Sequence, residues 1–136
     1  MGTLPDIKHQ ILELVHESYP DIELVYIFGS YAKKRARSNS DIDIAVQFKH
    51  SQNKSKIFRR FLEFISDVSL KLGTNQVDCV LLNITDDPLL LMQIYKYGQV
   101  VYDKGDQRVR FAIKAQGFYN DYKYLQNFYK MASSSK

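Results

Sequence analysis

Apolar and polar residues follow two different periods along this chain. Four short runs are continuously apolar or alternate apolar and polar residues, which is the pattern of strands in a sheet. These runs are 24–28, 42–48, 76–82 and 99–102. In four longer segments the apolar residues recur every three or four positions, as they do on one face of a helix. These segments are 3–19, 57–72, 89–97 and 106–131.

The order of these elements predicts an α/β (α+β) fold. Strands and helices alternate through most of the chain, so we expect a small mixed β-sheet flanked by helices. The helix over 57–72 would link two strands as a crossover. The last segment, 106–131, predicts a long C-terminal helix that has no strand after it.

Local signals mark the boundaries of several elements. Thr3 and Pro5 predict the start of the first helix, and Asp86-Asp87 predict the start of the helix over 89–97. Gly73 predicts the end of the crossover helix. The polar residues 50–56 before that helix predict an exposed loop.

Two aspartates open the strand predicted over 42–48. Because side chains alternate along a strand, Asp41 and Asp43 point to one face and lie about 7 Å apart. Two carboxylates at that spacing repel each other unless a cation lies between them. Mg²⁺ suits such a site, because it prefers hard oxygen ligands and usually takes one or two protein carboxylates plus substrate phosphates.

A glycine and a serine end the preceding strand. Gly29 has no Cβ, so a phosphate can approach its backbone closely, and Ser30 adds a hydroxyl where a helix could begin. Phosphate contacts and metal ligands would then lie on adjacent strand ends. Each motif alone also has an ordinary structural interpretation, a turn for the Gly-Ser pair and a solvated strand face for the aspartates.

A third acid, Asp78, interrupts the apolar run over 76–82. A carboxylate in a largely buried strand is costly unless it is paired, hydrogen-bonded or bound to a metal. Asp78 is therefore a candidate ligand for the same site. The alternative is an aspartate near the exposed start of its strand.

The spacing of these residues resembles a family signature. Gly29-Ser30, ten intervening residues and Asp41-Ile42-Asp43 are similar to the G-S-x10-D-x-D motif of the polymerase-β-type nucleotidyltransferases, in particular the minimal nucleotidyltransferase (MNT) family. Asp78 resembles the third carboxylate of these enzymes, which lies in a Val-Asp-hydrophobic sequence. The similarity covers most of residues 7–103 and implies a polymerase-β-like nucleotidyltransferase fold.

The resemblance also implies an activity. In nucleotidyl transfer a hydroxyl attacks the α-phosphate of ATP and pyrophosphate leaves, and two Mg²⁺ ions stabilise the charge on both oxygens. Asp41 and Asp43 are expected to bridge the two ions. Asp78 is expected to bind the catalytic ion and is a candidate acceptor for the hydroxyl proton. Gly29 and Ser30 are expected to hold the β- and γ-phosphates.

The loop between the two motifs carries four cations, Lys33, Lys34, Arg35 and Arg37. They are candidates for a cationic rim around the triphosphate, although a charge run in a loop is ordinarily just solvated. Lys34 stands where many family members have glycine, so the turn after the Gly-Ser motif must be made differently in this chain.

Small MNT proteins are often encoded beside HEPN-domain proteins. The resemblance implies an antitoxin that transfers AMP from ATP to a tyrosine of a HEPN ribonuclease toxin. We expect an MNT domain over 1–103, a helical extension over 104–131 that docks the partner, and a disordered tail over 132–136. Two alternatives remain open. One is a nucleotidyltransferase acting on a small molecule or tRNA, and the other is a non-catalytic module that inhibits a toxin by binding.

Charge and cysteine content indicate the kind of partner and the cellular compartment. Residues 103–136 hold seven Lys or Arg against three Asp or Glu, so they carry the whole net charge of +4. The predicted helix there is also rich in aromatic residues, which favours a protein partner over direct nucleic-acid binding, although simple packing on the domain is the alternative. The single cysteine, Cys79, excludes an internal disulfide and fits a cytoplasmic setting. No apolar segment approaches the roughly 20 residues that span a bilayer, so no membrane association is expected.

Overall fold

The protein is described here by a computed structural model, which defines residues 2–32 and 41–134. Four strands form one sheet in the order β3-β2-β1-β4. Their bounds are β1 (Ile22–Phe28), β2 (Ile42–Phe48), β3 (Val77–Leu81) and β4 (Gln99–Asp103). Strand β1 runs antiparallel to both β2 and β4, whereas β2 and β3 are parallel. The predicted mixed sheet is therefore confirmed.

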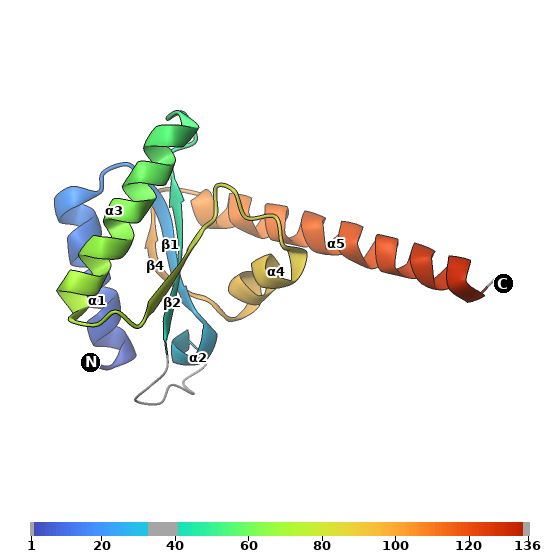
Figure 1. Ribbon diagram of the computed structural model, residues 1–136, viewed down its shortest axis with the longest axis horizontal. Coiled ribbons are helices and arrows are strands. Elements are labelled where there is room, and N and C mark those ends of the chain that lie inside the picture. The colour runs from blue at the N-terminus through green and yellow to red at the C-terminus, as the bar shows by residue number, and fades with distance from the viewer. Residues whose placement is uncertain (1, 33–40, 135–136) are drawn as a thin grey trace.

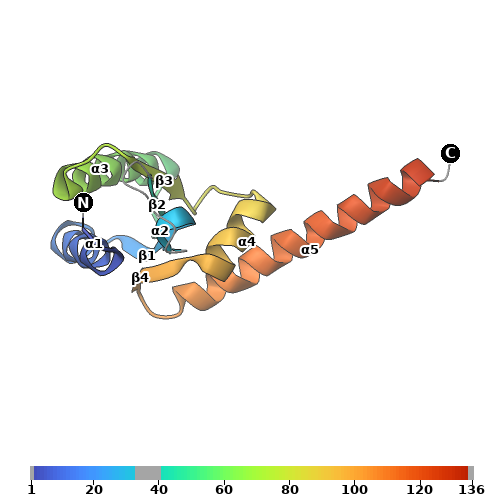
Figure 2. The same ribbon diagram turned by 90° about the horizontal axis from the view of Figure 1, so that it is seen from below.

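Helices cover both faces of this sheet. They are α1 (Leu4–Ser18), α2 (Gly29–Ala32), α3 (Lys54–Leu72), α4 (Pro88–Tyr97) and α5 (Gln107–Ser134). Helices α1 and α3 lie on one face and α4 and α5 on the other (Figures 1 and 2). The long helix α5 packs on α4 and then extends well beyond the sheet (Figure 1). Within residues 2–32 and 41–134, no helix has the combination of length and hydrophobicity needed to cross a bilayer.

Each face of the sheet has its own hydrophobic core. Alternate residues of β2 divide between the two cores, because successive side chains of a strand point to opposite faces. Ile42 and Ile44 are fully buried against α1 and α3. Ala45 is fully buried on the other face, where Phe111 and Ala115 anchor the base of α5. Asp43 shares the face of Ala45, so the functional side of the sheet is the side that α4 and α5 cover.

The N-terminal signals seen in the sequence produce real helix caps. Thr3 caps α1 and forms a capping box with Asp6. Asp87 caps α4 by accepting hydrogen bonds from the backbone N–H groups of Leu89 and Leu90. These caps satisfy N–H groups that have no partner inside the helix, which fixes where each helix begins.

Two predicted boundaries were wrong. Helix α3 begins at Lys54 instead of Ile57, because the Asn53 side chain accepts a hydrogen bond from the N–H of Lys56 and caps the helix inside the predicted loop. Helix α5 continues to Ser134, so its last turn includes the first residues of the tail expected to be disordered, 132–136. Neither glycine nor proline stands there to stop it.

One buried ion pair ties α3 to the start of β1. The Arg60 guanidinium donates to both carboxylate oxygens of Asp21 at 2.9 Å and to the carbonyl of Ser18 at the same distance. It also stacks on the Tyr19 ring at 4.4 Å from the centroid. Burial would raise the pKa of Asp21, but the hydrogen bonds from Arg60 and Gln52 outweigh it and hold the pKa below its usual value.

Candidate active site

Gly29 and Asp43 meet where β1 ends and β2 begins. Phe28, the last residue of β1, pairs with Asp43 across the antiparallel ladder, so Gly29 follows directly beside that aspartate. Gly29 has a φ of 73°, a left-handed conformation that favours glycine. A Cβ at this position would overlap the Asp43 carboxylate oxygen and lie 3.0 Å from its Cγ. The conformation and the close packing both require glycine.

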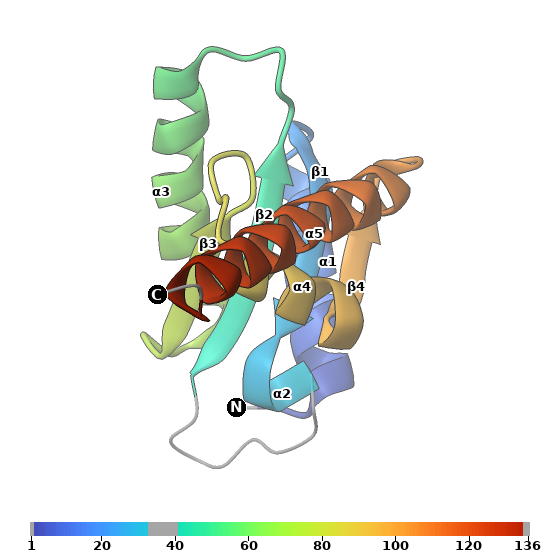
Figure 3. The ribbon, with the colours of Figure 1, turned by 90° about the vertical axis from the view of Figure 1, so that its right-hand side faces the viewer.

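The parallel pairing of β2 and β3 brings the second carboxylate into place. Asp43 and Asp78 are directly opposite each other in the ladder, so both side chains project from the same face of the sheet. Asp41 lies two residues before Asp43, immediately before β2, and is exposed. All three acids therefore lie at one end of the sheet. The short helix α2 lies at that end, directly after β1 (Figure 3).

The electrostatics of this end of the sheet favour a cation. Partial burial, and then the charges of Asp78 and Asp41, together raise the pKa of Asp43 to about 6. Like charges held close together disfavour the ionised form, so a bound cation would relieve the repulsion. The adjacent thiol of Cys79 responds to the same environment, because burial first, and then the charges of Asp78 and Asp43, raise its pKa to about 12. That thiol packs against the opposite core, as expected for a small hydrophobic side chain.

The donor set fits Mg²⁺ rather than a closed metal site. Over residues 2–32 and 41–134, no group of three or more Asp, Glu, His or Cys side chains is arranged so that it could hold a metal ion by itself. Asp43 and Asp78 offer adjacent carboxylates. Asp78 is exposed near the start of β3, as the alternative interpretation of its position predicted, and Asp41 is exposed immediately before β2. Mg²⁺ is commonly bound in this way, by one or two carboxylates with substrate phosphates and water completing the octahedron.

Ser30 follows Gly29 in α2, which is a single turn, and it is half-buried. The serine hydroxyl thus stands next to the residue that packs on Asp43. The four loop cations, Lys33, Lys34, Arg35 and Arg37, lie outside the described residues.

The sequence analysis did not predict that helix α4 lies beside this site. Helix α4 contacts both α2 and β1, so it covers the face of the sheet from which Asp43 and Asp78 project. Its apolar stripe indicated a packed helix but gave no sign of this position. Only the placement of α4 on the face shared by Asp43 and Asp78 shows the relationship.

The family follows from comparison with known proteins. Residues 10–107 match the sequence profile of the family described as "Polymerase beta, Nucleotidyltransferase". The chain belongs to this family. The predicted polymerase-β-like fold and the family resemblance are both confirmed.

One characterised relative and two solved structures refine the comparison. The chain is 44% identical over 39 residues to the protein adenylyltransferase MntA of Shewanella oneidensis; this stretch is 29% of the chain and only 28% of MntA. A toxin–antitoxin crystal structure with AMP-PNP contains a chain with 25% identity and a TM-score of 0.68, with 94% of this chain and 96% of that one covered.

The second structure is the tri-AMPylated Shewanella oneidensis HEPN toxin in complex with an MNT antitoxin. The identity is 23%, the TM-score is 0.64, and 96% of each chain is covered. At this identity the likeness shows a shared fold. It extends over α5 as well as the sheet, because the coverage exceeds the length of the sheet domain alone.

Proposed function

We propose that this protein is an antitoxin nucleotidyltransferase that transfers AMP from ATP to a tyrosine of a HEPN ribonuclease toxin. The observation that carries the proposal is the pairing of Asp43 with Asp78 on one face of the sheet, with Gly29 against Asp43. Membership of the nucleotidyltransferase family supports the reaction class. The similarity to the adenylyltransferase MntA, and to an MNT antitoxin bound to an AMPylated HEPN toxin, supports the nucleotide and the acceptor.

The reaction assigns a task to each residue of the site. Asp41 and Asp43 would hold two Mg²⁺ ions, with Asp78 on one of them. When bound, these ions supply positive charge to the attacking and leaving oxygens. Gly29, lacking a side chain, leaves the backbone open to the β- and γ-phosphates, and the Ser30 hydroxyl donates to them.

The proton of the acceptor tyrosine passes to one of the same carboxylates. The tyrosine oxygen forms a bond to the α-phosphorus while the bond from that phosphorus to the pyrophosphate oxygen breaks. Asp78, whose carboxylate lies beside that of Asp43, accepts the tyrosine proton as the general base. The products are the AMP-tyrosine ester and pyrophosphate.

We also propose that the distal part of α5 docks the partner. Its aromatic residues are open to solvent, with Tyr124, Phe128 and Tyr129 exposed by 72%, 58% and 67%. Aromatic anchors of this kind supply much of the binding energy in protein interfaces. The domain organisation therefore has a nucleotidyltransferase unit over 1–103 and a docking extension over 104–131.

The direct test is a transfer assay. The protein is incubated with Mg²⁺, α-labelled ATP and the HEPN protein that we expect to be encoded beside its gene. Intact-mass spectrometry then shows which molecule gains AMP. We expect AMP on a HEPN tyrosine and loss of ribonuclease activity. Chelation of divalent metal is expected to stop the transfer.

The control variant is Glu17→Gln, which removes an exposed carboxylate from α1, on the opposite face of the sheet from Asp43 and outside the docking extension. It should transfer AMP at the wild-type rate. Inhibition of the toxin without any covalent AMP would contradict the proposal and establish a non-catalytic binding module. AMP on a small molecule or tRNA, with the HEPN protein unmodified, would contradict the acceptor.

A further inference from the structure

A cationic pocket lies at the end of the sheet opposite to Asp43. It has a volume of about 170 Å³, and we call it the Lys114 pocket. Its walls come from the end of β2 and the first turns of α5. The lining residues are Gln47, His50, Gln107, Arg110, Phe111 and Lys114.

The central cation of this pocket, Lys114, is partly buried and has no carboxylate partner among the described residues. Lys114 is half-buried, and its ammonium group donates to the carbonyl of Leu82 at 2.9 Å. Burial lowers the pKa of Lys114, and the charge of Asp86 only partly offsets this effect. Among the residues that the structure describes, no carboxylate comes within 4.0 Å of Lys114 or Arg110. A partly buried cation in this state gains from an anion.

A pair of amides adds neutral donors to the pocket. Gln47 is a buried polar residue, and its Nε2 donates to Oε1 of Gln107 at 3.1 Å. Nε2 of Gln107 has no partner within the described part of the chain, so its N–H groups remain for a ligand. The pocket therefore combines two cations, a histidine and an amide donor, and its walls contain no acid. This is the chemistry that binds a phosphoryl group.

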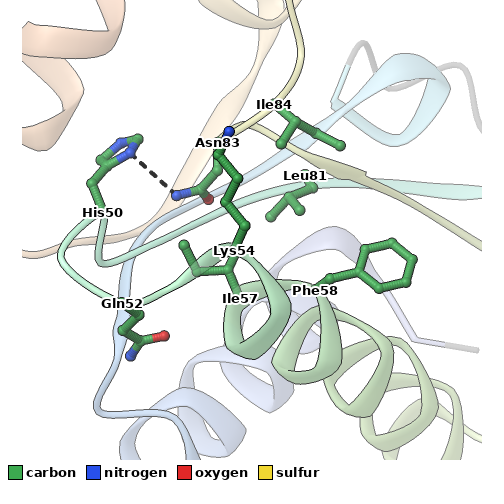
Figure 4. Close-up of a pocket in the computed structure, with 8 residues that line it drawn as sticks. All are labelled: His50, Gln52, Lys54, Ile57, Phe58, Leu81, Asn83 and Ile84. Carbon is green, nitrogen blue, oxygen red and sulfur yellow. Dashed lines mark hydrogen bonds between the residues drawn. The ribbon is translucent and has the colours of Figure 1, made fainter.

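An apolar pocket adjoins the first through His50, which lines both. We call it the Phe58 pocket; its volume is about 290 Å³. Figure 4 shows His50 on one side and Phe58 on the other, with Leu81 and Ile84 between them. Phe58 and Ile84 are exposed by 52% and 68%, so their apolar surfaces are open to a ligand.

Residues 81–83 contribute to both pockets and connect them. Leu82, which binds the Lys114 ammonium, lies between Leu81 and Asn83, and both of these line the Phe58 pocket. Asn83 is held against β2 by two hydrogen bonds to the backbone of Phe48, at 2.8 and 2.9 Å. The wall between the pockets is therefore fixed, and the distance between cation and apolar surface is set by the fold.

We propose that these adjoining pockets form a second binding site for a nucleoside monophosphate. The phosphoryl group would lie on Arg110, Lys114 and the Gln107 amide. The Lys114 pocket has room for such a group with a few waters, each of which occupies about 30 Å³. The base would lie against Phe58 and Ile84, since aromatic and apolar side chains accept the flat face of any base. This inference does not depend on the proposed AMP transfer, because Asp43 and Gln47 lie at opposite ends of β2.

The test is an amide NMR titration of the full chain with AMP, inorganic phosphate and adenosine, in the absence of divalent metal. We expect AMP to shift the amide signals of Asn83, Gln107 and Lys114 and to bind more tightly than phosphate or adenosine. Reading the shifts by residue separates this site from binding near Gly29. Because the readout needs no catalysis, failure here and failure of AMP transfer are distinguishable.

Three variants resolve the contributions. Arg110→Gln alters an exposed side chain and Lys114→Met preserves the length of a half-buried one, and each should weaken AMP binding by about tenfold. Phe58→Ser should weaken AMP binding but leave phosphate binding unchanged. The matched control is Lys123→Met, which removes an exposed cation from a later turn of α5 and should have no effect.

Several results would overturn the inference. One is the absence of shifts at Asn83, Gln107 and Lys114 at millimolar AMP. A second is unchanged AMP affinity in Arg110→Gln, which is informative even if Lys114→Met fails to fold. A third is adenosine binding as tightly as AMP, which would show that the cations hold no phosphoryl group.

Discussion

The Cα of Gly29 packs directly against the carboxylate of Asp43. No side chain can occupy the space between them, since a Cβ on Gly29 would overlap Oδ2 of Asp43. The contact joins the residue that precedes Ser30 to the central acid of the proposed metal site. The turn proposed to bind phosphate and the central acid proposed to bind metal are therefore packed against each other.

We expect Gly29→Ala to lower the rate of AMP transfer by about 100-fold. The added methyl would displace the Asp43 carboxylate, and a displacement of about 1 Å in a catalytic group typically costs about 100-fold in rate. The variant would also be less stable by about 1 kcal/mol, since alanine is strained at a φ of 73°. Transfer rate and thermal unfolding measure the two effects separately.

Gly73→Ala and Gly105→Ala provide controls for backbone strain. Both glycines have positive φ, 69° and 82°, but a Cβ at either position would meet nothing within 4 Å. These variants should lose a similar amount of stability and keep their activity. If they lost activity as Gly29→Ala does, strain and not the contact with Asp43 would be the cause.

We expect Asp43→Asn and Asp78→Asn each to lower AMP transfer by at least about 100-fold, because each removes a charge that would hold Mg²⁺. Binding gives a second readout. Saturating Mg²⁺ with a non-hydrolysable ATP analogue at 100 times its Kd should stabilise the wild type by about 2.7 kcal/mol. Neither variant should show this rise in melting temperature. A full rise in Asp43→Asn would exclude Asp43 as a metal ligand.

The pair of Arg60 and Asp21 predicts a pH-dependent contribution to stability. The side chains of Arg60 and Asp21 are only 22% and 11% exposed, so Arg60→Met should cost about 2–3 kcal/mol at neutral pH by leaving Asp21 without its cation. The folded-state pKa of Asp21 lies below its usual value of 3.8, so this stability is complete above pH 3.8 and is lost as the pH falls through the lowered pKa.

Denaturant unfolding of Arg60→Met and the wild type across that pH range checks the sign. The difference in unfolding free energy should shrink below pH 3.8. Glu63→Gln is the control, because it removes the other carboxylate bonded to Arg60, which is 47% exposed and should contribute less than about 1 kcal/mol. A constant difference at all pH values would show that Arg60 acts through packing on Tyr19 alone.

We expect Tyr124→Ser and Phe128→Ser to weaken binding to the proposed HEPN partner by about 10- to 100-fold without changing the fold. Both side chains are exposed and lie beyond the packed base of α5, so unfolding free energy should change by less than about 0.5 kcal/mol. Affinity measured by calorimetry tests this. Leu70→Ser, at an apolar position of α3 that is 78% exposed, should bind normally. Wild-type affinity in both Tyr124→Ser and Phe128→Ser, as in Leu70→Ser, would exclude the distal part of α5 as the docking element.

Local sequence determined much of this protein. The period of apolar residues identified all four strands and the long C-terminal helix, because side-chain direction repeats within each element. The Gly29-Ser30 and Asp41–Asp43 motifs could be placed on adjacent strand ends for the same reason, since each lies within a few residues of a strand boundary. Thr3 and Asp87 likewise act on N–H groups only two or three residues away.

Tertiary structure decided the relationships between distant segments. The placement of Asp78 opposite Asp43 depends on the register of β3 against β2, and a shift by one residue would have turned Asp78 to the other face. The Lys114 pocket joins the end of β2 to α5, which are about 60 residues apart along the chain. Strand register and helix placement follow from how the elements pack against one another. Periodicity within each element therefore determined the strands and helices, whereas packing between elements decided the Asp43–Asp78 pair and the Lys114 pocket.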